Sequence, residues 1–372
     1  MQKIMLIIIT LASILMLSGC RTTEPEDALE RYNYAFYDYM DTFISVSLTS
    51  ADAEEALGHR HAIEAIFSLY HYVSTAYEPL PEDAPYLNNI YAVNQQPGVA
   101  FEIDVELYDI LVKAQAYHEL TDGYFDVSIG KIIDVWKALA QTYKFSHHDP
   151  FEIPKEAFDD ALDALELIEV VEDPFEVWHD DGRYYVRINS EHVKIDLGAI
   201  SKGVATQKAY EYLREQDMTY FSISAGSSSI TLGQNINRQD EEGVFYVSLA
   251  NPMRPENPRD EPTTYGMIHV KDTGVTTSGN HEQFALYEGL RYHHIVSPFT
   301  KRPMHHYHTV TIIGYDAGLL DAVSTALFSM APAVFDAWME AHQETWGIEI
   351  IRYDTDGTIS TFLMDTVFEE RR

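Results

Sequence analysis

The sequence VKIDLGAISKGVATQKA, residues 193–209, indicates a short strand, a tight turn of small residues and the start of a helix. Asp196 ends the expected strand, and Lys202 stands in the first turn of the expected helix. Backbone N–H groups are free at a helix start, so together with a lysine they suit a phosphate group. On these residues alone, an ordinary strand-to-helix turn, with Gly198 at positive φ and Lys202 solvated, is the simpler interpretation.

The composition indicates a globular and strongly acidic protein. The chain has 372 residues, of which 46% are hydrophobic, and this is enough for one large domain or two ordinary ones. The formal net charge is -34, from 25 Lys and Arg against 59 Asp and Glu. Such a surface repels nucleic-acid backbones and anionic lipid headgroups. A phosphate ligand would therefore need cations placed beside it.

The N-terminus has the pattern of a secretory signal. Lys3 precedes an apolar run over residues 4–17, too short for a comfortable membrane span, and Leu-Ser-Gly-Cys follows at 17–20. This ending resembles the lipobox of bacterial lipoproteins, in which the cysteine becomes the lipidated first residue of the mature chain. We expect a signal peptide over residues 1–19, lipidation at Cys20 and a tether over residues 20–33. The alternative is a plain signal peptide with an incidental cysteine.

Hydrophobic periodicity predicts an α+β chain with a helix-rich N-terminal half, a strand-rich C-terminal half and a mixed or antiparallel sheet. A loop over residues 143–156 is the expected point of any subdivision. The expected helices cover residues 51–75, 104–120, 130–139, 155–167, 200–215, 316–330 and 332–343. The expected strands are a hairpin within 34–48 and residues 183–189, 193–196, 219–224, 229–233, 244–250, 266–271, 274–277, 291–296, 308–314, 348–353 and 358–363.

Two further turns of small residues stand at the ends of expected strands. They are SISAGSSS at residues 222–229 and VTTSGN at residues 275–280. Small residues let a backbone approach a ligand closely, although each segment is also compatible with an ordinary hairpin. Together with the turn at 198–203, these loops could line one pocket.

Histidines supply candidates for a general base. His293 and His294 would face opposite sides of a strand over 291–296, so at most one would enter a given pocket. One packed and one exposed histidine would explain the pair equally well. The nearby His305, His306 and His308 could bind a metal, but we interpret them as loop residues.

An aspartate and a threonine form a candidate metal site. Asp321 and Thr325 are four residues apart on the expected helix 316–330, hence on one face. A carboxylate and a hydroxyl are hard oxygen ligands of the kind that Mg²⁺ uses while it bridges to phosphates. The alternative is a threonine hydroxyl bonded within its own helix and an aspartate near the first helical turn.

Taken in chain order, these segments resemble motifs of the ApbE family, the FAD:protein FMN transferases, over nearly all of residues 34–366. The most recognisable is DLGAISKG at 196–203, which is similar to the family's Asp-Leu-Gly-Gly-Ile-Ala-Lys-Gly. The other matching segments are Met40-Asp41-Thr42-Phe43, Thr75-Ala76-Tyr77, Gly123-Tyr124-Phe125-Asp126 with Gly130 and Trp136, Thr277-Ser278-Gly279-Asn280, His293-His294-Ile295 with Pro298, and Asp321 with Thr325-Ala326-Leu327. The lipobox also fits, since many family members are lipoproteins.

The resemblance implies an ApbE-like fold and a Mg²⁺-dependent transferase, with Mn²⁺ as an alternative metal. The enzyme would move the FMN part of FAD onto a Ser or Thr hydroxyl of an acceptor protein and release AMP. The implied acceptor is a membrane redox subunit on the extracytoplasmic side of a bacterial membrane. The implied residues are Ala199, Asp321 and Thr325 at the metal, His294 and Lys202 in catalysis, and Met40, Tyr77, Asp126, Asp196, Lys202, Ala225, Gly226, Ser278 and Gly279 around FAD.

The chain departs from the family pattern at several positions. Ser227-Ser228-Ser229 replaces Gly-Gly-Asp, Val204 and Gln207 replace a tyrosine and an acidic residue, Ser297 replaces an aspartate and Asp41 replaces a glycine. These departures leave two alternatives open. One is an enzyme that hydrolyses FAD to FMN and AMP, and the other is a lipoprotein that binds flavin without catalysis.

Overall fold

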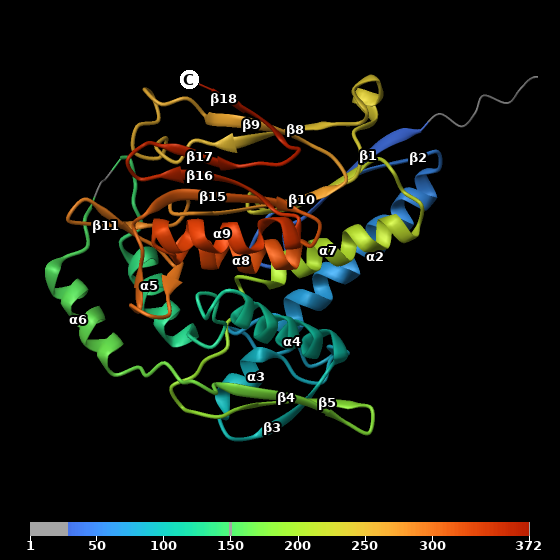
Figure 1. Ribbon diagram of the computed structural model, residues 1–372. Helices are drawn as coiled ribbons and strands as arrows, with labels where there is room; N and C mark the ends of the chain where they lie inside the picture. Colours follow the sequence, from blue (N-terminus) through green and yellow to red (C-terminus); the bar gives the residue numbers. More distant parts are fainter. Residues whose placement is uncertain (1–28, 149–150, 372) are drawn as a thin grey trace, which may run out of the picture.

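The computed structural model describes residues 29–148 and 151–371, which form an α+β fold with most helices in the first half and most strands in the second (Figure 1). The helices are α2 (Ala53–Ser74), α3 (Ile90–Gln95), α4 (Val105–Leu120), α5 (Gly130–Thr142), α6 (Lys155–Glu166), α7 (Ser201–Glu215), the 3₁₀ helix η1 (Ile236–Glu241), α8 (Ala317–Ser329) and α9 (Pro332–Trp346). The predicted fold class is confirmed.

The main sheet has eight strands, and each neighbouring pair in it is antiparallel. In spatial order its strands are β1 (Glu30–Phe36), β2 (Ile44–Ser50), β6 (Phe221–Ala225), β7 (Ser229–Leu232), β10 (Thr273–Gly279), β15 (Tyr307–Gly314), β16 (Glu349–Asp354) and β17 (Ile359–Phe362). Every residue of β15 is buried, which fits its central place between β10 and β16.

Four smaller sheets surround the main one. A sheet of β8 (Phe245–Ala250), β9 (Thr264–Val270) and β18 (Val367–Glu370) lies at the top of Figure 1, and a sheet of β3 (Ala100–Ile103), β5 (Arg183–Ile188) and β4 (Phe175–Asp180) lies at the bottom. Two short ladders join β11 (Ala285–Tyr287) to β12 (Leu290–Tyr292) and β13 (Val296–Ser297) to β14 (Arg302–Pro303). The sheet of β8, β9 and β18 shares an apolar cluster with strands of the main sheet.

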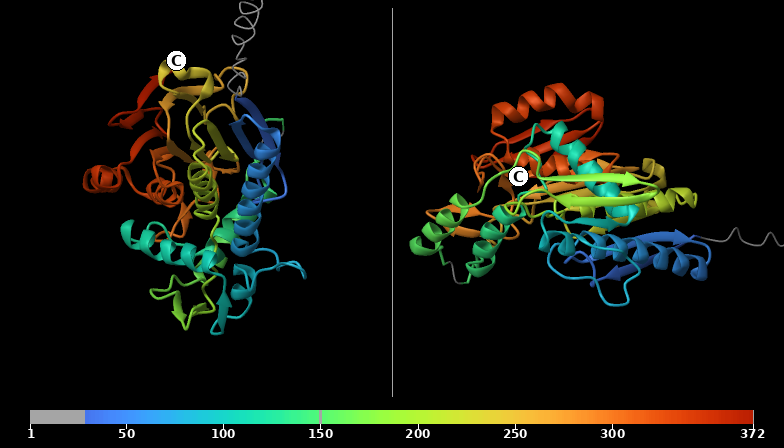
Figure 2. Two further views of the ribbon diagram at one scale, coloured as in Figure 1. Left: turned by 90° about the vertical axis from the view of Figure 1, so that its right-hand side faces the viewer. Right: turned by 90° about the horizontal axis from the view of Figure 1, so that it is seen from below.

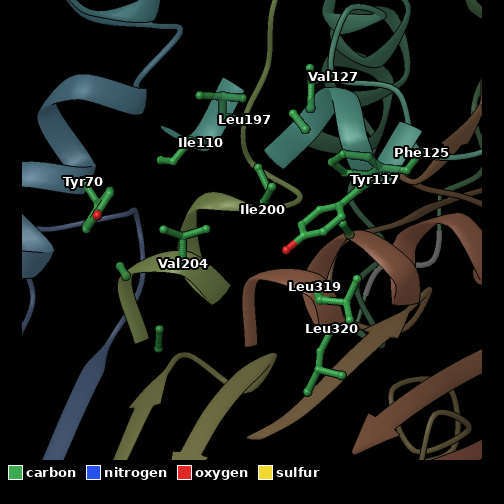
Figure 3. Close-up of a cluster of buried hydrophobic side chains, with 14 of the residues drawn as sticks. Tyr70, Ile110, Tyr117, Phe125, Val127, Leu197, Ile200, Val204, Leu319 and Leu320 are labelled. Carbon is green, nitrogen blue, oxygen red and sulfur yellow. The ribbon is translucent and has the colours of Figure 1, made fainter. Parts of the chain in front are cut away.

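Helices α2, α7 and α8 pack against the main sheet and against each other (Figure 2). The sequence of α8 is largely apolar, and nearly all of its residues are buried between the sheet and the neighbouring elements. Figure 3 shows Leu197, Ile200 and Val204 among side chains from α4 and α8. The segment at 193–209 is thus part of the central core as well as of the cavity described below.

Capping residues explain where several helices begin and end. Asp52 accepts a hydrogen bond from Glu54 N at 2.7 Å and begins α2, while Asp316 accepts from the backbone of Gly318 at 2.9 Å and begins α8. Helix α9 starts with Pro332 and ends at Gly347, whose φ of 59° is left-handed. Buried apolar faces then hold these helices against the sheet.

Some predicted elements are wrong in kind or in bounds. Residues 193–196 are extended and alternate between buried and partly buried, yet they form only an isolated bridge, between Ile129 and Lys194. The expected strand 291–296 is broken between β12 and β13. Helix α3 and the strands β3, β4, β11 and β18 were not predicted, because their short sequences show no clear periodicity.

The N-terminal predictions lie mostly outside the described residues. This holds for the signal peptide, for Cys20 and for most of the 20–33 tether. Strand β1 begins at Glu30, four residues before the expected boundary at residue 34. Within the described ranges, no helix has the length and apolarity needed to cross a membrane. In the loop near 143–156, Ile153 N donates to the carbonyl of Leu286 in β11, and Phe145 N donates to the carbonyl of Phe284 just before that strand.

Helices α7 and α8 approach each other most closely at Gly203. A Cβ atom at this position would lie 2.1 Å from the carbonyl oxygen of Ala317 and 2.9 Å from Cβ of Asp321. Both contacts involve atoms fixed near the backbone, so a small rotamer change could not relieve them. Glycine is therefore required at this crossing, and it brings the start of α7 next to Asp321.

We expect Gly203→Ala to lower the free energy of unfolding by about 1–3 kcal/mol, the usual cost of overpacking. The matched control is Gly58→Ala in α2, where nothing lies within 4 Å of the added methyl. Helix propensity should raise the free energy of unfolding of this control by up to about 1 kcal/mol. Urea unfolding of both variants measures the difference, and a Gly203→Ala protein as stable as the wild type would contradict the close crossing.

Candidate active site

A cavity of about 610 Å³ brings together nearly all residues that the motifs predicted. Its volume falls within the range of roughly 300–1,000 Å³ that is typical of small-molecule sites. Its lining includes Met40, Tyr77, Asp126, Asp196, Ala199, Lys202, Gly226, Ser278, Gly279, His294, Asp321 and Thr325. Ala225 is the exception, because it is fully buried within β6 and does not line the cavity.

The segment 193–198 is held by side-chain contacts and by backbone hydrogen bonds to residues 127–130, outside any named strand. Asn94 accepts a hydrogen bond from Ile195 N and donates one to Ile195 O, each at 2.8 Å. The Asp196 carboxylate accepts from Gly198 N at 2.8 Å, which closes the turn that precedes α7. Gly198 is not among the glycines with positive φ, so that part of the turn prediction is wrong. Lys202 donates to the carbonyl of Gly198 at 3.0 Å.

Tyr77 lies among charged groups at the edge of the cavity. Its hydroxyl donates to Asp196 Oδ2 at 2.7 Å, so Asp196 holds both Tyr77 and the 196–198 turn. The ammonium groups of Lys137 and Lys194 lie 4.1 Å and 4.3 Å from the centre of the Tyr77 ring. Burial, with Asp196 and Asp134 nearby, raises the pKa of Tyr77, so the phenol keeps its proton.

Asp321 is buried where α8 meets α7 and β7. Its carboxylate accepts hydrogen bonds from Gly203 N at 2.7 Å and from Ser229 Oγ at 2.9 Å. Burial raises the pKa of Asp321, while Lys202 and these two donors oppose the rise. The hydroxyl of Thr325 donates to the Asp321 carbonyl at 3.1 Å, so the back-bonded alternative considered for this threonine is observed.

The donor set around Asp321 fits a magnesium ion that shares its coordination with substrate and water. Asp321 and Thr325 both line the cavity, and both have oxygen lone pairs that their hydrogen bonds to protein groups do not use. Ala199 lines the same cavity and adds a backbone carbonyl. Within residues 29–148 and 151–371, no three His, Cys, Asp or Glu side chains gather into a metal site. A dedicated all-protein cage is therefore absent from the described part, whereas one carboxylate with substrate phosphates is the usual arrangement for Mg²⁺.

The two adjacent histidines have different environments. His293 is 0% exposed, and its Nδ1 accepts a hydrogen bond from Ile295 N at 3.2 Å. The surface of His294 is exposed where it lines the cavity, while protein atoms crowd around the residue. Burial, aided by the charges of Lys202 and Lys137, lowers the pKa of His294 to about 4. Only His294 faces the pocket, as predicted, and its ring is neutral at physiological pH.

The departures from the family pattern have structural counterparts. Ser229 supports Asp321, and Ser227 donates to the carboxylate of Glu282, which also lines the cavity. A carboxylate thus lies beside this hairpin, although it comes from another loop. Gln207 accepts from Ala317 N at 3.0 Å at the start of α8, and Val204 is buried against Gly318. Gln207 and Val204 therefore stabilise the contact between α7 and α8.

The turn that carries Met40 has an unusual backbone. Met40 and Asp41 have φ values of 58° and 50°, the left-handed region that favours glycine. The backbone N–H of Met40 donates to Nδ1 of His71 at 3.1 Å, and Thr42 Oγ1 would lie 2.4 Å from a Cβ atom at Gly226. This strained turn is thus held against the small-residue hairpin, and both line the cavity.

Sequence reasoning missed the contribution of β8 and β9 and of one lysine. Ser248 and Tyr265 line the cavity from the three-stranded sheet, and Thr311 lines it from β15. Their sequences look like ordinary strands, so no local signal could have found them. Lys137 also lines the cavity, but a lysine on a helix is usually solvated and gave no signal either.

Comparisons with known proteins agree with this geometry. A sequence model of the ApbE family matches residues 40–349. This chain belongs to the ApbE family. The prediction of a flavin-transferase family enzyme, made from the motifs, is thereby confirmed.

Curated relatives and solved structures resemble the chain at low identity. One relative from Klebsiella pneumoniae (strain 342), named FAD:protein FMN transferase, is 26% identical over 225 residues, which are 60% of this chain and 62% of that protein. A second relative of the same name and organism is 20% identical over 87% of this chain and 85% of its own length. The crystal structure of the ApbE protein from Thermotoga maritima has a TM-score of 0.67 at 23% identity, and the match covers 89% of this chain and 97% of that one. The structural match confirms the ApbE-like fold.

The pKa of His294 predicts a pH dependence of stability. The folded ring takes up a proton only near pH 4, against an ordinary pKa of 6.5, so the unfolded chain binds more protons between these values. The free energy of unfolding should therefore fall as the pH falls from about 6.5 to about 4. His294→Gln should remove part of that loss in thermal unfolding measured across this range. NMR titration locates the pKa directly, and a His294 resonance that titrates near 6.5 would contradict the lowered value.

Proposed function

We propose that this enzyme transfers the FMN part of FAD to a Ser or Thr hydroxyl of an acceptor protein and releases AMP. The observation that carries the proposal is the convergence of Lys202, His294, Asp321 and Thr325 in one cavity from distant parts of the chain. The names of the curated relatives support the same reaction. The predicted roles of these residues follow from their positions.

In the proposed reaction the acceptor oxygen bonds to the FMN phosphorus, and the bond from that phosphorus to the AMP oxygen breaks. The hydroxyl proton passes to a neutral ring nitrogen of His294, whose lowered pKa keeps it unprotonated above about pH 4. Lys202 would stabilise negative charge on the phosphoryl oxygens. Among the described residues, its ammonium forms no ion pair with a carboxylate and donates only to the carbonyl of Gly198. The protein thus acts mainly by positioning and by electrostatics.

Asp321, Thr325 and the carbonyl of Ala199 would hold a magnesium ion, or manganese in its place. When bound, the metal would neutralise charge on the pyrophosphate. Asp321 is oriented for this role by Gly203 N and Ser229 Oγ, which leave the carboxylate little freedom to turn.

A second candidate reaction is the hydrolysis of FAD to FMN and AMP. It is favoured by the open side of His294, which gives water the same access to the base as an acceptor hydroxyl. Flavin binding without turnover is the third outcome that an assay distinguishes. We further propose that Cys20 carries a lipid anchor, and that the enzyme acts on a membrane redox subunit at the extracytoplasmic face of a bacterial membrane.

The purified protein, incubated with FAD, Mg²⁺ and a candidate acceptor domain, should produce a covalent flavin adduct and an equal amount of AMP. Mass spectrometry of the acceptor measures the adduct. Mutating the acceptor serine or threonine to alanine is the control. His294→Ala should slow transfer by about 10²–10⁴-fold. AMP that forms equally fast without any acceptor would favour hydrolysis, and flavin binding without AMP would exclude both reactions.

Asp321→Asn should keep the fold and lose activity. The amide has the shape of the carboxylate, so transfer should fall roughly 100-fold or more through the lost charge, and added Mg²⁺ should no longer stimulate it. The thermal unfolding temperature at neutral pH should rise, because burial disfavours the charged form of Asp321. The matched control is Asp316→Asn, at a position where asparagine caps α8 as well as aspartate does. Unchanged transfer in Asp321→Asn would show that the metal assignment is wrong.

A further inference from the structure

Lys137 is a cation in the cavity that the proposed reaction does not yet use. It lies on α5 directly after the buried Trp136 and is partly exposed towards the cavity. Within the described residues it has no ion pair, and its ammonium lies 4.1 Å from the centre of the Tyr77 ring. In a protein of net charge -34, an ammonium group without a carboxylate partner inside a cavity is available to an anionic ligand.

The neighbouring Lys194 shows what a structural lysine looks like at this place. It also approaches the Tyr77 ring, at 4.3 Å, but its ammonium donates to Asp134 at 2.6 Å and its side chain is only 17% exposed. Another comparison is Lys131 on the same helix, which donates to the carbonyl of Glu191 and does not line the cavity. Lys137 is thus the member of this group whose side chain is free to move.

The strengths of the two interactions indicate where the Lys137 ammonium goes when a phosphate enters. A cation on an aromatic ring at an accessible site is a weak contact. A charge-assisted hydrogen bond to phosphate is stronger. A lysine on a flexible four-carbon stem can exchange the first contact for the second. Moving away from Tyr77 would also uncover part of that ring for the flavin.

We propose that Lys137 is a substrate-binding residue whose ammonium leaves the Tyr77 ring and pairs with the phosphate on the FMN half of the dinucleotide. The proposal rests on the proposed function and on the expectation that Met40 and Tyr77, which both line the cavity, lie beside the flavin. With the flavin against Tyr77, the phosphate of the FMN half would be the one nearer to this ring. Lys137 and Lys202 both lie within electrostatic reach of His294. Lys137 therefore makes the second cation of a phosphate site whose first cation is Lys202.

Binding of FMN and of riboflavin to the purified protein separates this role from others, since the two ligands differ by the phosphate alone. Quenching of flavin fluorescence measures both affinities. In Lys137→Gln, the Kd for FMN should rise about tenfold, which corresponds to about 1.4 kcal/mol, while the Kd for riboflavin should stay the same or fall. Lys137→Arg should keep most of the FMN affinity. Lys131→Gln, the matched control on α5, should change neither Kd.

Each other outcome overturns the inference in a recognisable way. Equal weakening of FMN and riboflavin would assign Lys137 to packing around the flavin ring, and unchanged affinity for both would make it a solvated lysine. If the wild type binds neither FMN nor FAD, the proposed function itself fails and the inference fails with it. Should Lys137→Gln not fold, the salt dependence of FMN affinity in the wild type and in Lys137→Arg, measured against that of riboflavin, decides the same question.

Discussion

The buried carboxylate of Asp321 is the interaction on which the site depends. It joins three elements, since it lies on α8 and accepts hydrogen bonds from Gly203 at the start of α7 and from Ser229 at the start of β7. Burying a carboxylate without hydrogen-bond partners costs free energy, so the fold favours the arrangement in which Asp321 meets both donors. That arrangement needs a glycine at position 203, because any larger side chain would meet Ala317. The geometry of the core and that of the cavity are therefore set by the same contact.

The described part of the cavity contains unpaired positive charge, although the whole molecule is strongly negative. Acidic residues outnumber basic ones by 59 to 25, and Lys194 beside the site is paired with Asp134. Among the described residues, Lys137 and Lys202 have no carboxylate partners. An anionic ligand is repelled by the surface in general and attracted at this place, so the arrangement favours selectivity for a ligand that carries phosphate.

Sequence reasoning succeeded where a motif carries its own chemistry and failed where structure depends on distant contacts. Asp196, Lys202, His294, Asp321 and Thr325 were singled out because their order matched a known pattern, and all five line one cavity. The strand expected at 193–196 failed because its backbone bonds go to Asn94 and to an irregular segment near Ile129, and neither is readable from local periodicity. Ala225 failed because its neighbour Gly226 turns the chain, so that only the glycine reaches the cavity. Lys137 could not be predicted at all, since only tertiary packing brings α5 to Tyr77.

The lysines connect substrate binding to the strength of the base. Lys202 and Lys137 help to lower the pKa of His294, which keeps the ring neutral but makes it a weak proton acceptor. Burial is the larger cause of the lowered pKa, and the two lysines add to it. In the proposed complex, a phosphate paired with these ammonium groups would offset their charge and so remove their part of the lowering. The base would then be stronger beside a bound phosphate than without one, which favours proton transfer in the substrate complex.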